Sequence, residues 1–435
     1  MSGPSWTFEQ AERYLLSLEL FGVRFGLDRM RRLMTVLDSP QLRFAAVHVV
    51  GTNGKSSTAR MTASLLRCHG LRTGAYLSPH LSSFAERIEI QGRQVSPEQF
   101  AAAVQSAAHA AALVNRSLAG DDHVTQFEAL TAAAYFELAR SRVEAAVIEA
   151  GLGARYDATS VIEPRVVVLT NVGLEHRRWL GPTEQHIAEE KLALVPSGGT
   201  IVAGPLGADA LAVAERTARE RKAILLLAGR DFHVEDEGEA FAVRTPLQRH
   251  GGIVLRPLGS FQRMNFAAAA CAAEAFLGRL DTNRVREAAR LRLPGRLEVV
   301  EHDPLVVLDG AHNPHAAVAL RASLEPLLAG RKLTAVISIL DDKDAAAVLS
   351  VLLPVCERVV FTRSTHQRAL PPATLESLSR QLGGPPAELA GDPSAALSRA
   401  REIARAEGAV LVTGSIYLLS DLVRLAEEGR SRVSR

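Results

Sequence analysis

A glycine-rich turn near the N-terminus carries the clearest chemical signal in the sequence. Residues 46–58 read AVHVVGTNGKSST, an apolar run followed by two glycines, a lysine and hydroxyl residues. Glycines let backbone N–H groups approach phosphate oxygens, the lysine adds positive charge, and a serine hydroxyl can bind Mg²⁺. The segment therefore predicts a site for the phosphates of a nucleoside triphosphate. Its residues are Gly51, Thr52, Asn53, Gly54, Lys55, Ser56 and Ser57.

The same residues are also compatible with a glycine turn that binds nothing. The two glycines are closer together than in the common Gly-x4-Gly-Lys-[Ser/Thr] loop, by two residues. A strand before the turn and a helix after it are the elements that a phosphate site requires, and the flanking sequence suits both. We therefore favour phosphate binding over a chance turn.

Polar residues follow several apolar runs at places where a metal ion could bind. Ser78 and Glu149 lie at the ends of two runs, Asp157 follows the second, and His176 follows a third. Ligands of parallel sheets gather at the carboxyl ends of the strands, so we expect these side chains near the glycine turn. Each one alone could be a turn former or a solvated loop residue. Their shared placement favours a metal site.

A further group of polar residues follows an apolar run in the last third of the chain. Asp309 ends this run, and His312 comes three residues later. Asn313 and Pro314 also fit the N-cap and first turn of a helix. This structural explanation leaves Asp309 and His312 available at a strand end.

Apolar runs of four to seven residues alternate with helical patterns along most of the chain. This alternation predicts an α/β fold with a mostly parallel sheet. Strands are expected at 46–50, 72–77, 144–150, 165–170, 200–203 and 223–228, then at 297–301, 305–309, 333–339, 357–362 and 409–413. Helices are expected at 56–69, 97–114, 127–140, 184–194, 206–220, 264–278 and 282–290. Between them, 231–258 predicts short antiparallel strands with a turn at Gly251-Gly252. Pro294-Gly295 marks a boundary between two domains, 1–293 and 294–435.

The bulk composition excludes several classes of protein. The formal net charge is +2 and aromatic residues make up 5% of the chain, so no footprint for nucleic acid is evident. No run of 18 apolar residues indicates a membrane span, and the three cysteines are scattered singly, which disfavours disulfides and zinc. We expect a cytoplasmic protein that acts as a monomer. Only five of the 50 basic residues are lysines, so Lys55 and Lys191 invite a specific role for an amine.

Nine motifs in order resemble a known family. They are Gly51-Thr52-Asn53-Gly54-Lys55, Ser78-Pro79-His80-Leu81, Glu149-x-Gly-Leu-Gly, Asp157-Ala158-Thr159, His176-x-x-Trp-Leu-Gly, Glu190-Lys191, Pro294-Gly295-Arg296, Asp309-Gly-Ala-His312-Asn313 and Gly414-Ser415. With the opening Phe21-Gly22-x-x-Phe25-Gly26 segment, the chain resembles the folylpolyglutamate synthase/dihydrofolate synthase family of the Mur ligase superfamily over nearly its whole length.

The resemblance implies a fold and a reaction. The fold is a P-loop domain of the Mur ligase type followed by a smaller Rossmann-like α/β domain. The reaction is the ATP-dependent joining of L-glutamate to a pterin-bearing carboxylate, dihydropteroate or tetrahydrofolate or both, through an acyl phosphate. Small-molecule substrates are the only partners that it implies.

The resemblance also assigns roles to single residues. Gly51 to Ser57, Asn265, Arg296 and Asp309 would bind ATP. Ser78, Glu149, His176 and Lys191 would bind Mg²⁺, Lys191 after carbamylation of its amine. The acid substrate would meet Thr125, Phe127, Glu128, Tyr156, Asp157 and Ala158, and glutamate would meet His312 and Ser415. Lys55, Lys191 and His312 would be the catalytic residues. Without carbamylation, Lys191 would be a helix-surface lysine paired with a glutamate.

Several positions depart from the family pattern and leave alternatives open. Ser56 replaces a glycine, as in cell-wall Mur ligases, and Tyr156 replaces a leucine at the acid side. Such departures motivate a second hypothesis, a related ligase that joins an amino acid to a different, non-folate acid. A third hypothesis is a nucleotide-dependent switch or a noncatalytic ATP-binding module. No asparagine precedes any lysine, so the Asn-Lys-x-Asp guanine motif is absent and the switch is disfavoured.

Overall fold

The computed structural model describes residues 5–19 and 26–433. The Phe21–Phe25 part of the N-terminal motif lies outside these residues. The chain forms two compact units. One comprises Met1–Ser78, Ser83–Leu255 and Arg263–Leu291, and the other comprises Pro79–Ser82, Arg256–Gln262 and Arg292–Arg435. Two short stretches of the N-terminal part thus belong to the second unit.

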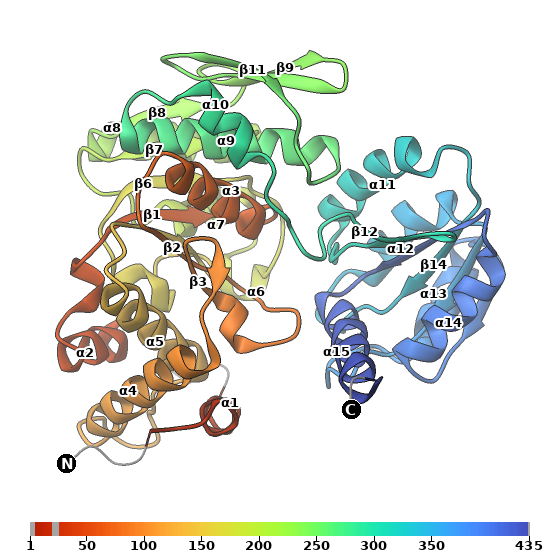
Figure 1. The fold of residues 1–435 in the computed structure, drawn as a ribbon, viewed down its shortest axis with the longest axis horizontal. Helices are drawn as coiled ribbons and strands as arrows, with labels where there is room; N and C mark the ends of the chain where they lie inside the picture. The colour runs from red at the N-terminus through yellow and green to blue at the C-terminus, as the bar shows by residue number, and fades with distance from the viewer. Residues whose placement is uncertain (1–4, 20–25, 434–435) are drawn as a thin grey trace. The chain divides into compact units, whose positions relative to one another are not determined.

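An eight-stranded sheet with the order β4-β3-β2-β5-β1-β6-β7-β8 forms the centre of the first unit (Figure 1). Its strands are β1 (Ala45–Val50), β2 (Thr73–Tyr76), β3 (Ile88–Ile90), β4 (Arg93–Gln94), β5 (Ala145–Glu149), β6 (Pro164–Leu169), β7 (Thr200–Ala203) and β8 (Ile224–Leu227). The six strands β2-β5-β1-β6-β7-β8 are neighbours in this order and pair in parallel, which confirms the predicted sheet. The antiparallel strands β3 and β4 were not predicted.

Helices cover both faces of this sheet. They are α1 (Phe8–Ser17), α2 (Asp28–Val36), α3 (Lys55–Cys68), α4 (Pro97–Asn115), α5 (Gln126–Arg140), α6 (Arg177–Leu180), α7 (Glu184–Leu192), α8 (Ala208–Arg221), α9 (Ser260–Leu277) and α10 (Thr282–Ala288). Helix α3 packs on β1, β2 and β5, while α7 and α8 pack on β6 and β7. Thus the helix that begins at the glycine turn is anchored on the central strands.

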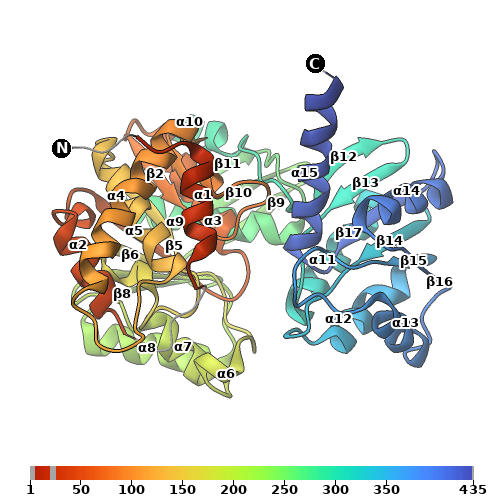
Figure 2. The same cartoon turned by 90° about the horizontal axis from the view of Figure 1, so that it is seen from below.

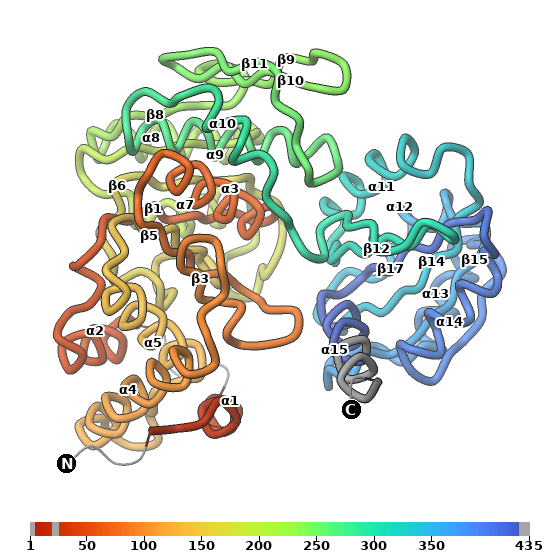
Figure 3. The backbone as a smooth tube through the Cα atoms, in the orientation of Figure 1, coloured from red at the N-terminus to blue at the C-terminus, as the bar shows by residue number. Residues whose placement is uncertain are grey.

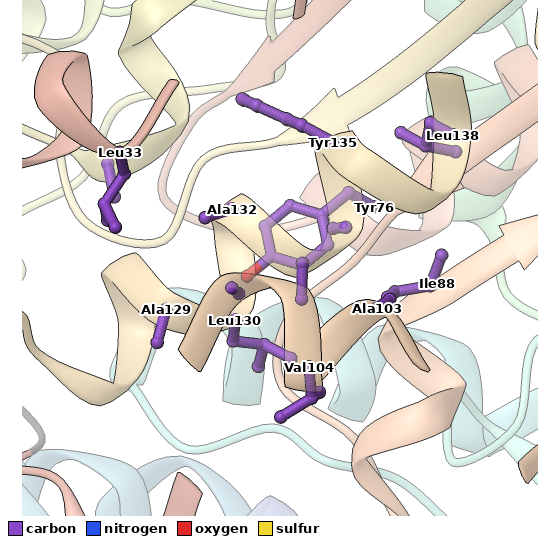
Figure 4. Close-up of a cluster of buried hydrophobic side chains, with 14 of the residues drawn as sticks. Leu33, Tyr76, Ile88, Ala103, Val104, Ala129, Leu130, Ala132, Tyr135 and Leu138 are labelled. Atoms are coloured by element: carbon purple, nitrogen blue, oxygen red, sulfur yellow. The ribbon is translucent and has the colours of Figure 1, made fainter. Parts of the chain in front are cut away.

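The largest core cluster of the first unit lies between the sheet and helices α4 and α5 (Figure 4). Tyr76 and Tyr135 are fully buried there, with ring centroids 6.4 Å apart in an edge-to-face arrangement. Alanines such as Ala103 and Ala132 line the facing helices and let them approach closely. Burial raises the pKa of Tyr76 to about 12, and its hydroxyl pairs with Thr131 at 3.1 Å.

A three-stranded antiparallel sheet follows, with the order β11-β10-β9. Its strands are β9 (His233–Glu237), β10 (Ala240–Arg244) and β11 (Arg249–Ile253). The predicted turn at Gly251-Gly252 is wrong, because both glycines lie inside β11. The register shifts at this point, and Gly252 has a φ of +65°, which is typical of a glycine at a bulge. The chain turns instead at 245–248, where the Thr245 N–H donates to the Gln248 carbonyl.

The second unit contains a six-stranded sheet with the order β12-β13-β17-β14-β15-β16. Its strands are β12 (Glu298–His302), β13 (Leu305–Leu308), β14 (Leu333–Ile337), β15 (Arg358–Phe361), β16 (Ala387–Leu389) and β17 (Ala409–Thr413). All pair in parallel except the edge strand β12. Figure 3 follows the chain through these strands.

Five helices complete the second unit. They are α11 (Pro314–Leu328), α12 (Ala345–Leu352), α13 (Pro372–Gln381), α14 (Pro393–Ala404) and α15 (Ile416–Val433). Helices α11 to α13 contribute to one apolar cluster on the sheet, and α14 and α15 to another. Figure 2 shows the helices and strands of this unit from a second side. This layering confirms the predicted second α/β domain architecture.

Two further expectations concern cysteines and membranes. Cys271 and Cys356 are buried, Cys68 is half-buried, and all three are free thiols. Within the part of the chain that the structure describes, no helix combines the length and apolar character needed to span a bilayer.

Candidate active site

The glycine turn joins β1 to α3 in a conformation that its glycines make possible. Gly51 has a φ of +148°, and a Cβ atom there would lie 1.9 Å from Oγ1 of Thr170. Gly54 has a φ of +81°, and a Cβ atom there would lie 2.7 Å from Oδ1 of Asn265. A side chain at either position would therefore clash or strain the backbone. Asn265, from α9, thus packs directly on the turn.

The loop after β6 holds the glycine turn in place. The Thr52 N–H donates to the Asn171 carbonyl at 3.1 Å. The Asn53 N–H donates to Oδ1 of Asn171 at 3.0 Å, and Nδ2 of Asn171 donates to the Asn53 carbonyl at 3.1 Å. Thr170 donates to the same carbonyl at 2.6 Å. Thr170 and Asn171 were not predicted as supports of the turn, although Thr170 ends a predicted strand and Asn171 directly follows it.

Two lysine amines meet at one backbone carbonyl of the turn. Nζ of Lys55 donates to the carbonyls of Gly51 at 3.1 Å and Thr52 at 3.0 Å. Nζ of Lys191, which lies near the end of α7, donates to the same Gly51 carbonyl at 2.7 Å. Lys191 is 4% exposed. Burial, with a smaller contribution from the Lys55 charge, lowers its pKa to about 7.

Three of the predicted polar residues meet beside the first turn of α3. Oε1 of Glu149 accepts the Ser56 hydroxyl at 2.8 Å, and Oε2 accepts the Ser78 N–H at 2.9 Å. Glu149 is 1% exposed, so its carboxylate is held in a protein environment. Serine hydroxyls and carboxylates are oxygen ligands of the kind that Mg²⁺ prefers, so these residues suit that ion.

His176 lines a pocket that also includes Ala150, the residue after Glu149. Its φ of +52° is left-handed, and its Nε2 lies 3.6 Å from Oε1 of Glu175. Glu175, Lys55, Lys191 and Gly151–Gly153 line the same pocket as His176. Among the described residues, no group of three or more His, Cys, Asp and Glu side chains is clustered like a metal cage. A metal bound here would therefore need hydroxyl groups, water or phosphate oxygens as well.

The residues predicted to bind the acid substrate include side chains that are hydrogen-bonded within the protein and side chains that are exposed. Thr125 and Glu128 form the capping box of α5, and Nε of Arg29 donates to both carboxylate oxygens of Glu128 at 3.0 Å. Their polar atoms are thus used inside the protein. Phe127 packs near Gly151, at 2.7 Å from the position of a Cβ atom there. Tyr156, in contrast, is 53% exposed.

Asp157 and Ala158 lie at the start of a 3₁₀ helix, Ala158–Val161, and both are buried. Oδ2 of Asp157 accepts the Leu152 N–H at 2.7 Å, and Oδ1 accepts the Thr159 N–H at 3.0 Å. Burial raises the pKa of Asp157, and these hydrogen bonds oppose the shift. The carboxylate therefore closes the loop that forms one wall of the pocket.

The candidates of the second unit follow the carboxyl ends of β13 and β17. Asp309 is 5% exposed and accepts the N–H groups of Leu297 and Ala311, both at 2.8 Å. Burial raises the pKa of Asp309, and the Arg296 charge opposes the shift. Nδ1 of His312 lies 2.8 Å from the Gly310 carbonyl.

Ser415 and Asn313 occupy helix starts in the second unit. Ser415 is buried between β17 and α15, and its Oγ accepts the Tyr417 N–H at 3.2 Å. Asn313 caps α11 by accepting the Ala316 N–H at 2.8 Å, as predicted.

Comparison with known proteins decides the family. The profile of the Mur ligase middle domain matches residues 49–273, and that of the Mur ligase glutamate ligase domain matches 295–416. The dihydrofolate synthase/folylpolyglutamate synthase of Bacillus subtilis is 32% identical over 429 residues, which are 95% of this chain and 98% of that protein. The chain belongs to the dihydrofolate synthase/folylpolyglutamate synthase family of Mur ligases.

Other members of this family agree in sequence and in fold. The Escherichia coli dihydrofolate synthase/folylpolyglutamate synthase is 31% identical over 96% of this chain and 95% of its own. The Mycobacterium tuberculosis folylpolyglutamate synthase complexed with ADP superposes with a TM-score of 0.91 at 31% identity, covering 96% of this chain and 98% of that one. These matches confirm both the predicted resemblance and the predicted fold class.

Some relatives are longer than this chain. The probable bifunctional folylpolyglutamate synthase/dihydropteroate synthase of Haloferax volcanii is 34% identical over 95% of this chain, which spans 50% of that protein. The similarity is therefore to one part of that bifunctional protein.

Proposed function

We propose that this chain joins L-glutamate to a pterin-bearing carboxylate with consumption of ATP. The supporting observation is the phosphate turn with Lys55 at its centre and Ser56, Ser78 and Glu149 beside it. The relatives named above are dihydrofolate and folylpolyglutamate synthases, and one of them was solved with ADP. These names favour a folate-type acid over the alternative of a different, non-folate acid.

The chemistry starts from a carboxylate, which is a poor electrophile. An oxygen of the acid attacks the γ-phosphorus of ATP, and the bond to the ADP oxygen breaks. The acyl phosphate then carries a good leaving group. The amine of glutamate attacks its carbonyl carbon, loses a proton and expels phosphate, which forms the amide.

The phosphate turn binds and orients the nucleotide in this proposal. The backbone N–H groups at the N-terminus of α3 face phosphate oxygens, and Lys55 supplies a cation, while the N–H groups of Thr52 and Asn53 stay bonded to Asn171. In the described structure Lys55 contacts carbonyls of its own turn, so a phosphate would replace these contacts. Asn265, which packs on Gly54, is placed to contact the same ligand.

Mg²⁺ would neutralise phosphate charge at this site and polarise the γ-phosphoryl group. Ser56, Ser78 and Glu149 would provide the oxygen atoms, and His176 is one of the residues that line the neighbouring pocket. Lys191 enters this set as a carbamate. An amine with a pKa near 7 is partly neutral at physiological pH and can attack CO₂, which converts a cation into an anionic ligand.

The remaining candidates would serve the two acids and the nucleotide. Arg296 and Asp309 suit the nucleotide, and His312 and Ser415 suit glutamate. For the pterin acid we retain Phe127, Tyr156, Asp157 and Ala158 as contacts, with Thr125 and Glu128 supporting them from α5. The monomeric state and the cytoplasmic location expected from the sequence stay predictions.

A single assay tests the proposed function. Purified protein is incubated with ATP, Mg²⁺, glutamate and either dihydropteroate or tetrahydrofolate, and both phosphate and the ligated product are measured. We expect stoichiometric phosphate and amide with at least one of these acids. Phosphate release with a non-folate carboxylate alone would overturn the folate assignment while retaining the ligase.

Carbamylation of Lys191 is tested by chemical rescue. Lys191→Ala should lose activity by about a hundredfold or more, because the metal loses a ligand beside the transferred phosphoryl group. Millimolar acetate should restore part of this activity by supplying a carboxylate in the vacated space. Unchanged activity of Lys191→Ala without acetate would show that Lys191 is not a metal ligand.

A further inference from the structure

A histidine lies in the middle of the central strand β1. His48 has no exposed surface and stands between Val47 and Val49. Its neighbours in register on the adjoining strands are Ile148 and Val167, which are both fully buried. A polar ring in such surroundings loses its hydrogen bonds to water, so it needs partners inside the protein.

The partner of His48 belongs to the loop after β5. Nε2 of His48 lies 3.0 Å from Oγ1 of Thr159, which is also fully buried. The same Oγ1 lies 2.5 Å from Oδ1 of Asp157. The other carboxylate oxygen of Asp157 accepts the Leu152 N–H at 2.7 Å. A continuous series of hydrogen bonds therefore runs from β1 to the wall of the pocket.

The direction of these hydrogen bonds follows from the groups involved. An ionised carboxylate only accepts, so the Thr159 hydroxyl donates its single hydrogen to Asp157. The hydroxyl must then accept from His48, whose hydrogen lies on Nε2. Nδ1 of His48 is left as a buried acceptor with no partner among the described residues. Burial lowers the pKa of His48 to about 4, consistent with a neutral ring.

An apolar side chain would fill the place of His48 without leaving a buried polar atom unpaired. Central parallel strands are ordinarily built from valine, isoleucine and leucine, as the neighbours of His48 are. The unpartnered Nδ1 is unfavourable, because a buried polar atom without a hydrogen bond has lost its water. Packing alone therefore does not account for His48, whereas its Nε2 donor has a defined use.

The loop that receives this support forms part of the candidate site. Gly151, Leu152 and Gly153 line the pocket that Lys55 and Lys191 also line. Thr159 is held from a second side, since the Tyr135 hydroxyl donates to its carbonyl at 2.7 Å. Small shifts of Thr159 would thus be passed to Asp157 and to the wall of the pocket.

We propose that His48 is a positioning residue for the ligase reaction. Through Thr159 it fixes the orientation of Asp157 and of the loop 151–157, against which the acid substrate binds. This inference rests on the proposed function for its kinetic consequence. The phosphate turn has its own supports, Thr170 and Asn171, so we expect the effect to fall on the acid rather than on ATP.

Steady-state kinetics of three variants test this proposal. His48→Leu removes the donor, and Thr159→Val removes the hydroxyl with almost no change in volume. For both we expect KM for the acid to rise about tenfold, with KM for ATP changed less than about twofold. His48→Gln should recover most of the loss, because its amide nitrogen can donate to Thr159. Val167→Ala is the control, since it removes buried volume beside His48 without touching the series.

Hydrogen exchange of peptides covering residues 151–157 provides a readout that needs no substrate. Protection of this loop should fall in His48→Leu and Thr159→Val and stay at the wild-type level in Val167→Ala. Equal protection and equal KM values in all variants would overturn the positioning role, as would a His48→Gln variant no better than His48→Leu. Failure of the wild type to ligate a pterin acid would instead contradict the proposed function. If His48→Leu does not fold, Thr159→Val and His48→Gln decide the outcome.

Discussion

Lys191 places a titratable amine at a site where it is only 4% exposed. Its folded pKa is about 7, against an ordinary value near 10.5. Between these two values the unfolded chain binds a proton that the folded chain does not bind. The free energy of unfolding therefore rises with pH across this window. The cost of burying the charged amine reaches its full size below pH 7, where Lys191 is protonated in the folded protein as well.

The pH dependence of unfolding tests this burial. Lys191→Met keeps the length of the side chain and removes the charge. In nucleotide-free, CO₂-free buffer, we expect the variant to be more stable than the wild type at pH 7. This advantage should shrink by up to about 2 kcal/mol between pH 7 and 9, because one pKa unit corresponds to about 1.4 kcal/mol. Denaturant unfolding at both pH values gives the comparison, and parallel pH profiles would contradict a depressed pKa.

At this scale the sequence indicated which residues gather, but not what holds them. Ser78 and Glu149 lie together because parallel strands bring their carboxyl ends to one edge, a rule that needs no coordinates. Asn171 is hydrogen-bonded to Asn53, and Thr159 is hydrogen-bonded to the buried His48. In both pairs the partners lie more than a hundred positions apart in the sequence. Such contacts depend on the register of the sheet, which the sequence alone does not supply.

Within the first unit, a buried carboxylate attaches the antiparallel sheet β9–β11 to helix α9. Glu274 of α9 accepts the Thr245 hydroxyl at 2.6 Å and the Leu247 N–H at 3.1 Å, both from the turn between β10 and β11. It is 3% exposed, and burial raises its pKa. This contact fixes the turn to the helix that also carries Asn265.

Removal of this carboxylate should cost stability. Glu274→Leu leaves the Leu247 N–H without its acceptor, whereas the Thr245 hydroxyl can still donate to the Gln248 carbonyl at 3.0 Å. We expect the substitution to cost about 1–3 kcal/mol, the value for one buried donor left unpaired. Glu274→Gln keeps an acceptor and should lie between this variant and the wild type. Denaturant unfolding measures the difference. Glu239→Ala, an exposed residue at the turn between β9 and β10, is the control and should change stability by less than about 0.5 kcal/mol. A Glu274→Leu protein as stable as that control would show that the contact contributes nothing.

The elements themselves were predicted best where a strong pattern repeats. β7 and β17 occur at the predicted residues, and α3, α4 and α5 differ from their predictions by at most one residue at each end. The errors arise where local signals compete. Gly251-Gly252 has the composition of a turn, but the two glycines form a bulge opposite a single residue of β10. Strands β3 and β4 are three and two residues long, too short to show a period.

The path of the chain between the two units is a property that no local pattern shows. The division near residue 293 predicted from Pro294-Gly295 allows the chain to pass from one domain to the other only once. The structure assigns Pro79–Ser82 and Arg256–Gln262 to the second unit as well. A four-residue stretch has no period of its own, so only the packing of Leu81 reveals where it belongs. The two units are therefore not the products of two separate halves of the chain.

Leu81 allows this mixed origin to be tested in the whole molecule. It packs against the cluster of the second unit formed by residues such as Leu308 and Leu419. Leu81→Ala should destabilise that unit by about 1–2 kcal/mol, as expected for loss of a half-buried leucine. Hydrogen exchange should then accelerate in β17 of the second unit while β1 of the first keeps its protection. Leu42→Ala, at a site 68% exposed, is the control and should leave both unchanged. Equal exchange of β17 in Leu81→Ala and the wild type would show that this stretch adds nothing to the second unit.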